Sequence, residues 1–255
     1  MKRIIRLLLS YIPRPWLIRL SMIFMKSAAL FYRGNRVECP VCGGHFRKFL
    51  PYGYNKVREN VLCPGCLSLE RHRLMWLYLK NRTDFFSGSL KVLHLAPEQC
   101  FYKRFRKMRN ITYVTADLES PLADVKLDVQ EMPFKEDEFD IVICNHVLEH
   151  VPDDRKAIRE IFRVLRHGGF AILQVPTDYS MEETSEDASV TDPLEREKRF
   201  RQKDHYRMYG QDYLNRLTEA GFVIGEENYL LTLSREDREH FRLPAMEFMY
   251  GYKKL

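Results

Sequence analysis

Apolar residues gather into short runs from about residue 68 to the end of the chain, and amphipathic stretches separate these runs. Buried strands are predicted at 91–95, 111–115, 125–128, 139–144 and 170–175. Helices are predicted between them, at 68–81, 99–109, 153–166 and 211–220. Two further runs, at 222–227 and 247–252, are candidates for closing strands. Strands that alternate with helices predict an α/β fold, a doubly wound parallel sheet with helices on both faces.

The pattern lapses between residues 176 and 210, where charged residues replace the apolar runs. In doubly wound sheets, ligands bind outside the carboxyl ends of the strands, and this segment follows such an end. We therefore expect either a lid over a substrate or a solvated loop with a short surface helix. Within it, Arg207 and Tyr209 are candidates to meet an anionic or sugar substrate, and surface positions are the alternative.

The first 36 residues are both apolar and basic. Eight basic side chains precede the first acid, Glu38, and the rest of the chain holds 33 basic against 35 acidic residues. The excess positive charge therefore lies in one N-terminal arm, and a general nucleic-acid-binding face is not expected.

This arm does not suit a bilayer span, because Arg14, Arg19 and Lys26 interrupt its apolar windows and Pro13 and Pro15 break its middle. A secretory signal also fits poorly, since no small-residue cleavage site follows the leucine run. Two basic amphipathic helices hinged at the prolines would lie on an anionic membrane surface. Packing on the domain or on a partner protein is the alternative. A cytoplasmic protein, peripheral on the inner membrane, is the expectation.

Four cysteines form two tight pairs, Cys39-Pro-Val-Cys42 and Cys63-Pro-Gly-Cys66. Each Cys-x-x-Cys turn supplies two thiolates, and two such turns complete the tetrahedron that zinc prefers. A structural zinc ribbon is predicted over residues 37–67; disulfides or a redox pair are the alternatives. The other cysteines, Cys100 and Cys144, carry no pairing signal, which agrees with a reducing cytoplasm.

Two stretches carry a family resemblance: Phe139-Asp-Ile-Val-Ile-Cys-Asn-His-Val-Leu-Glu-His-Val151 and Ile161-Phe-Arg-Val-Leu-Arg-His-Gly-Gly-Phe170. They resemble class I S-adenosylmethionine-dependent methyltransferases of the broad subgroup acting on small molecules and glycans. The likeness extends over roughly residues 88–252. It implies a Rossmann-like domain at 68–255, following the zinc ribbon, with S-adenosylmethionine as the cofactor.

The resemblance also implies which residues hold that cofactor. Asp117 falls where the family binds the ribose hydroxyls, and Asp128 with Val129 falls where it holds the adenine. The first loop departs from the family, because Ala96, Glu98 and Cys100 stand where glycines are usual. Glu98 would then be the counter-ion of the cofactor's methionine ammonium. The implied cofactor-binding residues are His94, Ala96, Glu98, Asp117, Leu118, Asp128, Val129 and Asn145.

Methyl transfer to a hydroxyl benefits from a general base, and the candidates are His146 and His205. His146-Val-Leu-Glu149-His150 also spells H-x-x-E-H, a zinc-protease motif when it lies on a long helix. Here it follows a predicted strand at once and precedes Pro152, which disfavours such a helix.

The expected activity is O-methylation of a small-molecule, surface-glycan or lipid-linked precursor. An RNA-modifying methyltransferase that holds RNA with its zinc ribbon is one alternative, although nucleic acid is an improbable partner on the charge distribution. A non-catalytic zinc-ribbon scaffold with a degenerate methyltransferase fold is the other, favoured by the loop that lacks glycines.

Overall fold

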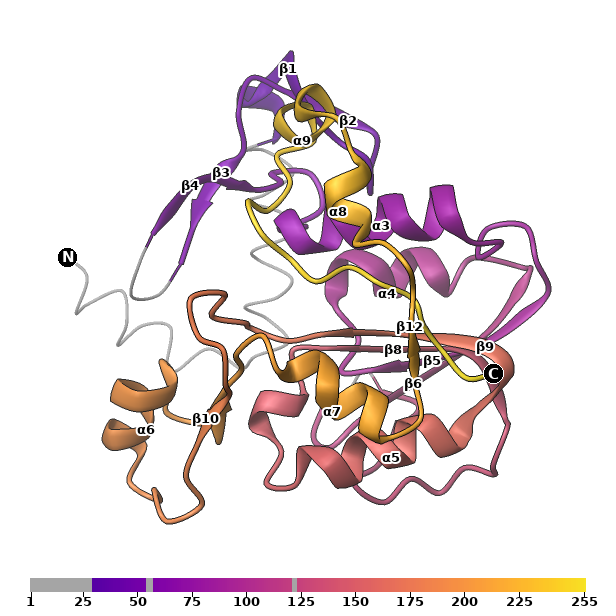
Figure 1. The fold of residues 1–255 in the computed structure, drawn as a ribbon. Helices are drawn as coiled ribbons and strands as arrows, with labels where there is room; N and C mark the ends of the chain where they lie inside the picture. The colour runs from indigo at the N-terminus through magenta and orange to yellow at the C-terminus, as the bar shows by residue number, and fades with distance from the viewer. Residues whose placement is uncertain (1–28, 54–56, 121–122) are drawn as a thin grey trace. The chain divides into compact units, whose positions relative to one another are not determined.

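The computed structural model describes residues 29–53, 57–120 and 123–255, which form two compact units (Figure 1). Among the described residues, the first unit comprises those up to Trp76 together with Ser234–Pro244, and the second comprises those from Leu77 to Leu233 with Ala245–Leu255. The membrane-binding helices predicted for the N-terminal arm lie outside the described residues. Within the described residues, no helix is both long enough and apolar enough to cross a bilayer.

The first unit contains two small antiparallel sheets, the first part of one helix and the whole of another. β1 (Arg33–Cys39) pairs with β2 (Gly44–Phe46), and β3 (Leu50–Tyr52) pairs with β4 (Arg58–Leu62). α3 (Glu70–Arg82) begins here, and α9 (Arg235–His240) joins from far along the chain. β1 begins at Arg33, so the last four residues of the predicted arm belong to a strand and not to a helix.

A buried arginine explains why a C-terminal segment belongs with the first unit. The Arg73 guanidinium donates to the carbonyls of Val61 and Ser68, both at 2.9 Å, and to those of Phe241 and Arg242, both at 2.6 Å. A buried cation needs such partners, so α9 and the loop after it are held here. The two compact units divide inside α3 and not at the predicted boundary before residue 68, and residues 234–244 lie in the first unit.

The second unit is built on a mostly parallel seven-stranded sheet, as predicted. Its order is β12-β13-β9-β8-β5-β6-β7, and only β13 and β12, at one edge, are antiparallel to their neighbours. The strands are β5 (Leu90–Leu95), β6 (Ile111–Asp117), β7 (Val125–Lys126), β8 (Phe139–Asn145), β9 (Leu165–Gln174), β12 (Val223–Ile224) and β13 (Tyr252–Lys253). All seven residues of β8 are buried, as expected for a central strand covered on both faces.

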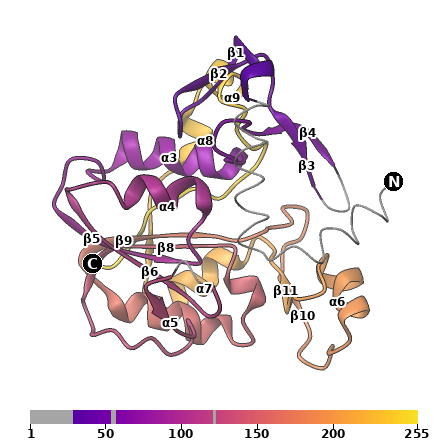
Figure 2. The ribbon, with the colours of Figure 1, turned by 180° about the vertical axis from the view of Figure 1, so that it is seen from behind.

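Helices cover both faces of this sheet. α4 (Gln99–Phe105) lies on one face, and α5 (Asp154–Val164) and α7 (Tyr213–Glu219) lie on the other (Figures 1 and 2). Asp153 caps α5 by accepting a hydrogen bond from the Lys156 amide at 2.9 Å. The buried stripe of α5 packs into the main core; its members are Ala157, Ile158, Ile161 and Val164.

Several predicted boundaries are wrong. β9 starts directly after α5, so residues 165–169, which precede the strand predicted at 170–175, already belong to it. Phe139 pairs with Leu165 but Ile141 pairs with Phe170, and this bulge absorbs the extra residues. α4 ends at Phe105 instead of 109, and each closing strand has only two residues. The short helix α8 (Tyr229–Thr232) is not apparent from the sequence pattern.

The insertion at residues 176–210 contains secondary structure, including the short surface helix expected for one of the two alternatives, while the lid over a substrate stays a prediction. β10 (Ser185–Glu186) pairs with β11 (Arg207–Met208), and α6 (Pro193–Phe200) packs beside them (Figure 2). A small core of its own holds the insertion together; it consists of Val190, Phe200 and Met208, with Met181 packed against it.

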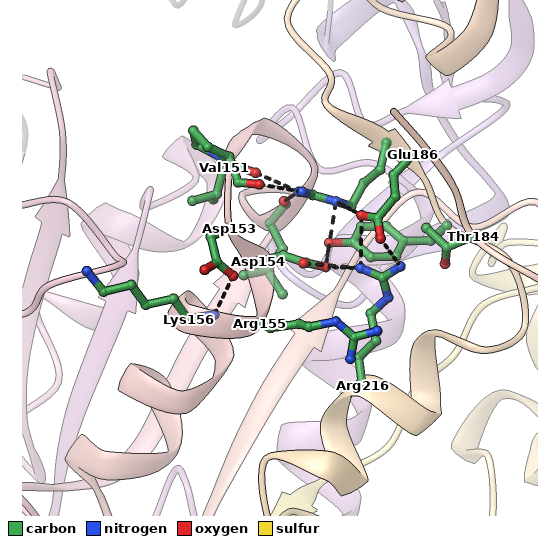
Figure 3. Close-up of polar contacts among 12 residues, drawn as sticks. Val151, Asp153, Asp154, Arg155, Lys156, Thr184, Glu186 and Arg216 are labelled. Atoms are coloured by element: carbon green, nitrogen blue, oxygen red, sulfur yellow. Dashed lines mark hydrogen bonds and ion pairs between the residues drawn. The ribbon is translucent and has the colours of Figure 1, made fainter. Parts of the chain in front are cut away.

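A buried ion network joins the insertion to α5 and α7 (Figure 3). Asp154 accepts from Arg216 at 2.9 and 3.1 Å and from the Tyr209 hydroxyl at 2.8 Å. Arg216 also donates to Glu186 at 2.9 Å, and Arg207 donates to the same carboxylate at 3.0 Å. Arg207 and Tyr209 are therefore buried structural groups and not the substrate contacts considered above.

We predict that Asp154→Asn lowers the free energy of unfolding of the second unit by about 3–5 kcal/mol, because it leaves two buried guanidinium groups with one carboxylate fewer. Urea denaturation followed by circular dichroism measures this change. Glu219→Gln is the matched control: it breaks the exposed Arg155–Glu219 pair and should cost at most about 1 kcal/mol. Equal effects of the two substitutions would contradict the structural role of the network.

Candidate active site

The polar residues of interest follow three neighbouring parallel strands. The chain enters the sheet at β5, builds outward through β6 and β7, and then returns to add β8 on the other side of β5. The strand order therefore reverses between β5 and β8, and a crevice at such a reversal is where doubly wound sheets bind ligands.

Glu98 spans this reversal. Its Oε2 lies 2.6 Å from His94 Nε2, at the end of β5, and its Oε1 accepts from Asn145 Nδ2 at 3.1 Å, at the end of β8. The Glu98 side chain keeps 15% of its surface exposed, whereas that of His94 is fully buried. One carboxylate is thus fixed from both strands and still reaches the surface. The structure brings together three of the predicted cofactor-binding residues.

His94 is itself held from the far side by Tyr113 on β6. The Tyr113 hydroxyl lies 2.8 Å from His94 Nδ1. Burial, together with the negative charge of Glu98, raises the pKa of Tyr113, so its hydroxyl keeps its proton at neutral pH. The hydroxyl can therefore donate to Nδ1 while the Nε2–H group donates to Glu98. Tyr113 was missed from the sequence, because a tyrosine within an apolar strand gives no signal of a polar contact across to the next strand.

The loop after β5 keeps a glycine-like turn without a glycine. Ala96 has φ of 49°, in the left-handed region that glycine favours, and its amide donates to the Ala116 carbonyl at 2.8 Å. The backbone therefore turns at the first of the three substituted glycine positions. Cys100, at the third, is buried in α4.

The predicted ribose and adenine residues lie along the same edge. Asp117 ends β6, and its Oδ1 accepts from the amides of Glu119 and Ser120 at 2.8 and 2.7 Å. Leu118 beside it is 65% exposed, a large apolar side chain open to a ligand. Asp128 follows β7, where its Oδ1 accepts from the Gln130 amide at 2.8 Å, and Val129 is buried next to it.

Both candidate bases lie against one buried carboxylate. Glu149 is in the single 3₁₀ turn η1 (Leu148–His150), and its Oε1 lies 3.2 Å from His146 Nδ1. Burial alone would raise the pKa of Glu149. The neighbouring His146 and His150 lower this pKa by more than burial raises it, so the net pKa is below its ordinary value and Glu149 is ionised at neutral pH. Burial lowers the pKa of His205, which is neutral at pH 7. The short turn confirms that His146 and His150 do not lie on the long helix of a zinc protease.

The four cysteines of the first unit converge as the ribbon prediction requires. Cys39 Sγ lies 3.6 Å from Cys66 Sγ, and Cys42 Sγ lies 3.7 Å from Cys63 Sγ. Zinc–sulfur bonds of about 2.3 Å in a tetrahedron place sulfurs about 3.75 Å apart, so the cluster fits zinc. The Gly65 amide also donates to Cys63 Sγ at 3.3 Å, which favours a thiolate. All four thiols are free, so the disulfide alternative is wrong for this structure.

Comparison with known proteins identifies part of the second unit. Residues 88–173 match the sequence profile of a family described as "Methyltransferase domain". Among curated proteins, the methyltransferase YcgJ of Bacillus subtilis is 43% identical over 44 residues, covering 17% of each chain. The arsenite methyltransferase of Mus musculus is 33% identical over 76 residues, covering 27% of this chain and 18% of its own.

A ubiquinone/menaquinone biosynthesis C-methyltransferase, UbiE of Vibrio vulnificus, is 44% identical over 45 residues, covering 18% of this chain and 17% of its own. The chain thus spans less than a fifth of the length of these curated relatives. Among solved structures, YcgJ superposes with a TM-score of 0.43 at 16% identity, covering 71% of this chain and 95% of that one. An S-adenosylmethionine-dependent methyltransferase of Mesorhizobium loti gives 0.47 at 15%, covering 71% and 97%. The segment that matches the family, residues 88–173, holds β5, β6, β7, β8 and most of β9.

Proposed function

We propose that the chain is an S-adenosylmethionine-dependent methyltransferase. The single observation that carries this proposal is the Glu98 carboxylate, fixed by His94 and Asn145 across the reversal of the strand order. It supplies a negative charge where the ammonium of the cofactor's methionine moiety would bind. The family match at residues 88–173 supports the same conclusion.

The other residues along this edge would complete the cofactor site. Asp117 would accept from the ribose hydroxyls, Leu118 would cover the apolar side of the cofactor, and Asp128 with Val129 would hold the adenine. Ala96 would line the loop beside Glu98. When bound, S-adenosylmethionine supplies an electrophilic methyl group on a positively charged sulfur, and the protein contributes position and a dry environment.

We propose His146 as the general base that takes a proton from the acceptor hydroxyl. Its Nδ1 faces the ionised Glu149, which favours the tautomer with hydrogen on Nδ1 and leaves the lone pair on Nε2. The backbone of His146 takes φ of 54°, an uncommon conformation for a residue other than glycine. That strained turn, together with Glu149, fixes the direction in which the imidazole points.

We predict that Glu98→Gln weakens binding of S-adenosylmethionine and of its demethylated product by about 10- to 100-fold, because a charge-assisted contact to the ammonium is lost. Isothermal titration calorimetry on the zinc-loaded protein measures both affinities. Glu136→Gln, an exposed substitution in the same unit, should leave them unchanged. No measurable affinity in the parent protein would instead favour the non-catalytic scaffold.

We propose that zinc occupies the Cys39, Cys42, Cys63 and Cys66 cluster and stabilises the first unit. Cys63→Ser should abolish the sulfur-to-cobalt charge-transfer band of the cobalt-substituted protein and unfold this unit, since binding of structural zinc contributes about 10–16 kcal/mol in small zinc-finger peptides. Cys100→Ser, a buried cysteine of the second unit, is the matched control and should retain the band. An unchanged band in Cys63→Ser would refute the assignment.

We further propose that the acceptor is a small glycan or a lipid-linked precursor methylated on oxygen at a membrane surface. The apolar and basic composition of the N-terminal arm supports this choice. Removing residues 1–28 leaves β1 intact and should abolish co-sedimentation with vesicles containing anionic lipid. The full chain with neutral vesicles is the control. Undiminished sedimentation of the shortened chain would remove the argument for a lipid-linked acceptor.

A further inference from the structure

Three side chains outside the cofactor site gather at the junction of η1 and the insertion. One carboxylate oxygen of Glu149 and one ring nitrogen each of His150 and His205 all lie within 4.8 Å of one another. The His150 and His205 rings pack edge to face, with centroids 4.7 Å apart. His205 comes from the insertion and the other two come from η1, so the cluster joins two segments more than 50 residues apart.

The hydrogen bonds of His205 fix its tautomer. Its Nδ1 lies 3.0 Å from the Phe200 carbonyl, which can only accept, so Nδ1 must carry the hydrogen. The lone pair therefore lies on Nε2, which is buried and has no hydrogen-bond partner among the described residues. A buried nitrogen lone pair without a donor is costly unless something binds it.

His150 is held in the same way. Its Nδ1 lies 3.2 Å from the Asp204 carboxylate, and its Nε2 lies 4.0 Å from Glu149 Oε1. A carboxylate or a carbonyl that accepts from one imidazole nitrogen is the usual second shell of a metal-binding histidine, because it orients the other nitrogen toward the ion. Both histidines of the cluster have such a partner.

Glu149 is the carboxylate of the cluster. Its Oε1 faces His146, while its Oε2 is buried with no hydrogen-bond partner within the described part of the chain. A buried carboxylate oxygen without a partner is costly unless a donor or a cation binds it. The exposed side of His150, with 35% of its side chain open, provides a path by which an ion can enter.

We propose that Glu149, His150 and His205 bind a divalent first-row transition metal, such as zinc or ferrous iron. Two imidazoles and one carboxylate suit these ions, whereas calcium and magnesium prefer oxygen ligands alone. Metal–ligand bonds of about 2.0–2.2 Å require the three atoms to move inward by about 1 Å. Three protein ligands leave a coordination position open.

This metal would hold the insertion against η1. The Tyr206 amide already donates to the Glu149 carbonyl at 2.8 Å, so the backbone on either side of His205 is docked there. Binding of an ion would add a second, pH- and chelator-sensitive connection at the same place.

The decisive experiment measures metal content and cobalt titration of the full chain, whose cysteine cluster keeps its own zinc. The parent protein should bind a second ion, and cobalt entering there should give weak d–d bands without a sulfur charge-transfer band. His150→Ala should weaken this second binding event by at least about 10- to 100-fold. Because His150 is partly exposed, this substitution should not disturb folding, which circular dichroism checks.

Two further variants sharpen the result. Asp204→Asn, which removes only the partner of His150, should weaken the second ion by about 10-fold. His167→Ala, an exposed histidine of the same unit outside the cluster, should leave both ions in place. A single ion per chain in the parent protein, or unchanged cobalt binding in His150→Ala, would overturn the proposal whether or not S-adenosylmethionine binds.

Discussion

The parallel alignment of β5 with both β6 and β8 is the constraint on which the site depends. Leu93 pairs with Val114 on one side and with Val142 on the other, so the three strands end at one edge. The residues that follow these strands therefore lie close together in space although they are far apart in the sequence. Glu98 and Asn145 are 47 residues apart, and only this register brings their side chains to 3.1 Å.

The buried ion network around Asp154 fixes the turn that contains Glu149, as the strand register fixes Glu98. Arg207 donates to the carbonyls of Leu148 and Val151 at 2.8 and 2.6 Å, while its Nε holds Glu186 of the insertion. Arg207 belongs to the insertion, and its guanidinium binds the backbone on both sides of Glu149. It therefore fixes the insertion to this turn. Burial makes each of these contacts costly to leave unmade, so the turn that presents Glu149 is rigid.

The pattern of apolar and polar residues was sufficient to predict the positions of the elements with strong periodicity. Apolar runs such as Phe139–Cys144 located the central strands, and the charge-rich gap located the insertion. The pattern was insufficient where a single long-range contact decides the structure. Arg73 looks like a surface residue of an amphipathic helix, yet it is buried because carbonyls from residues 241 and 242 reach it.

The same limitation applies to the site. Glu98 was identified because it replaces a glycine in a recognisable loop, and this signal is local. His205 was identified only as a histidine, since nothing near it in the sequence shows that Phe200 fixes its tautomer or that Glu149 lies beside it. An H-x-x-E-H motif binds a metal through its two histidines when it lies on one long helix, which the sequence disfavoured here. The structure instead supplies the second histidine from the insertion, which no spacing rule within the motif predicts.

Glu149 links the two proposals, because it contacts the candidate base and also belongs to the proposed metal cluster. Its Oε1 lies 3.2 Å from His146 Nδ1, and one of its oxygens lies within 4.8 Å of the ring nitrogens of His150 and His205. The turn η1 therefore carries the partner of the candidate base and also two of the three proposed metal ligands. Arg207 binds the carbonyls of Leu148 and Val151, on the two sides of Glu149, so it holds this turn in place for both roles. A change that displaces η1 would disturb the two sites together.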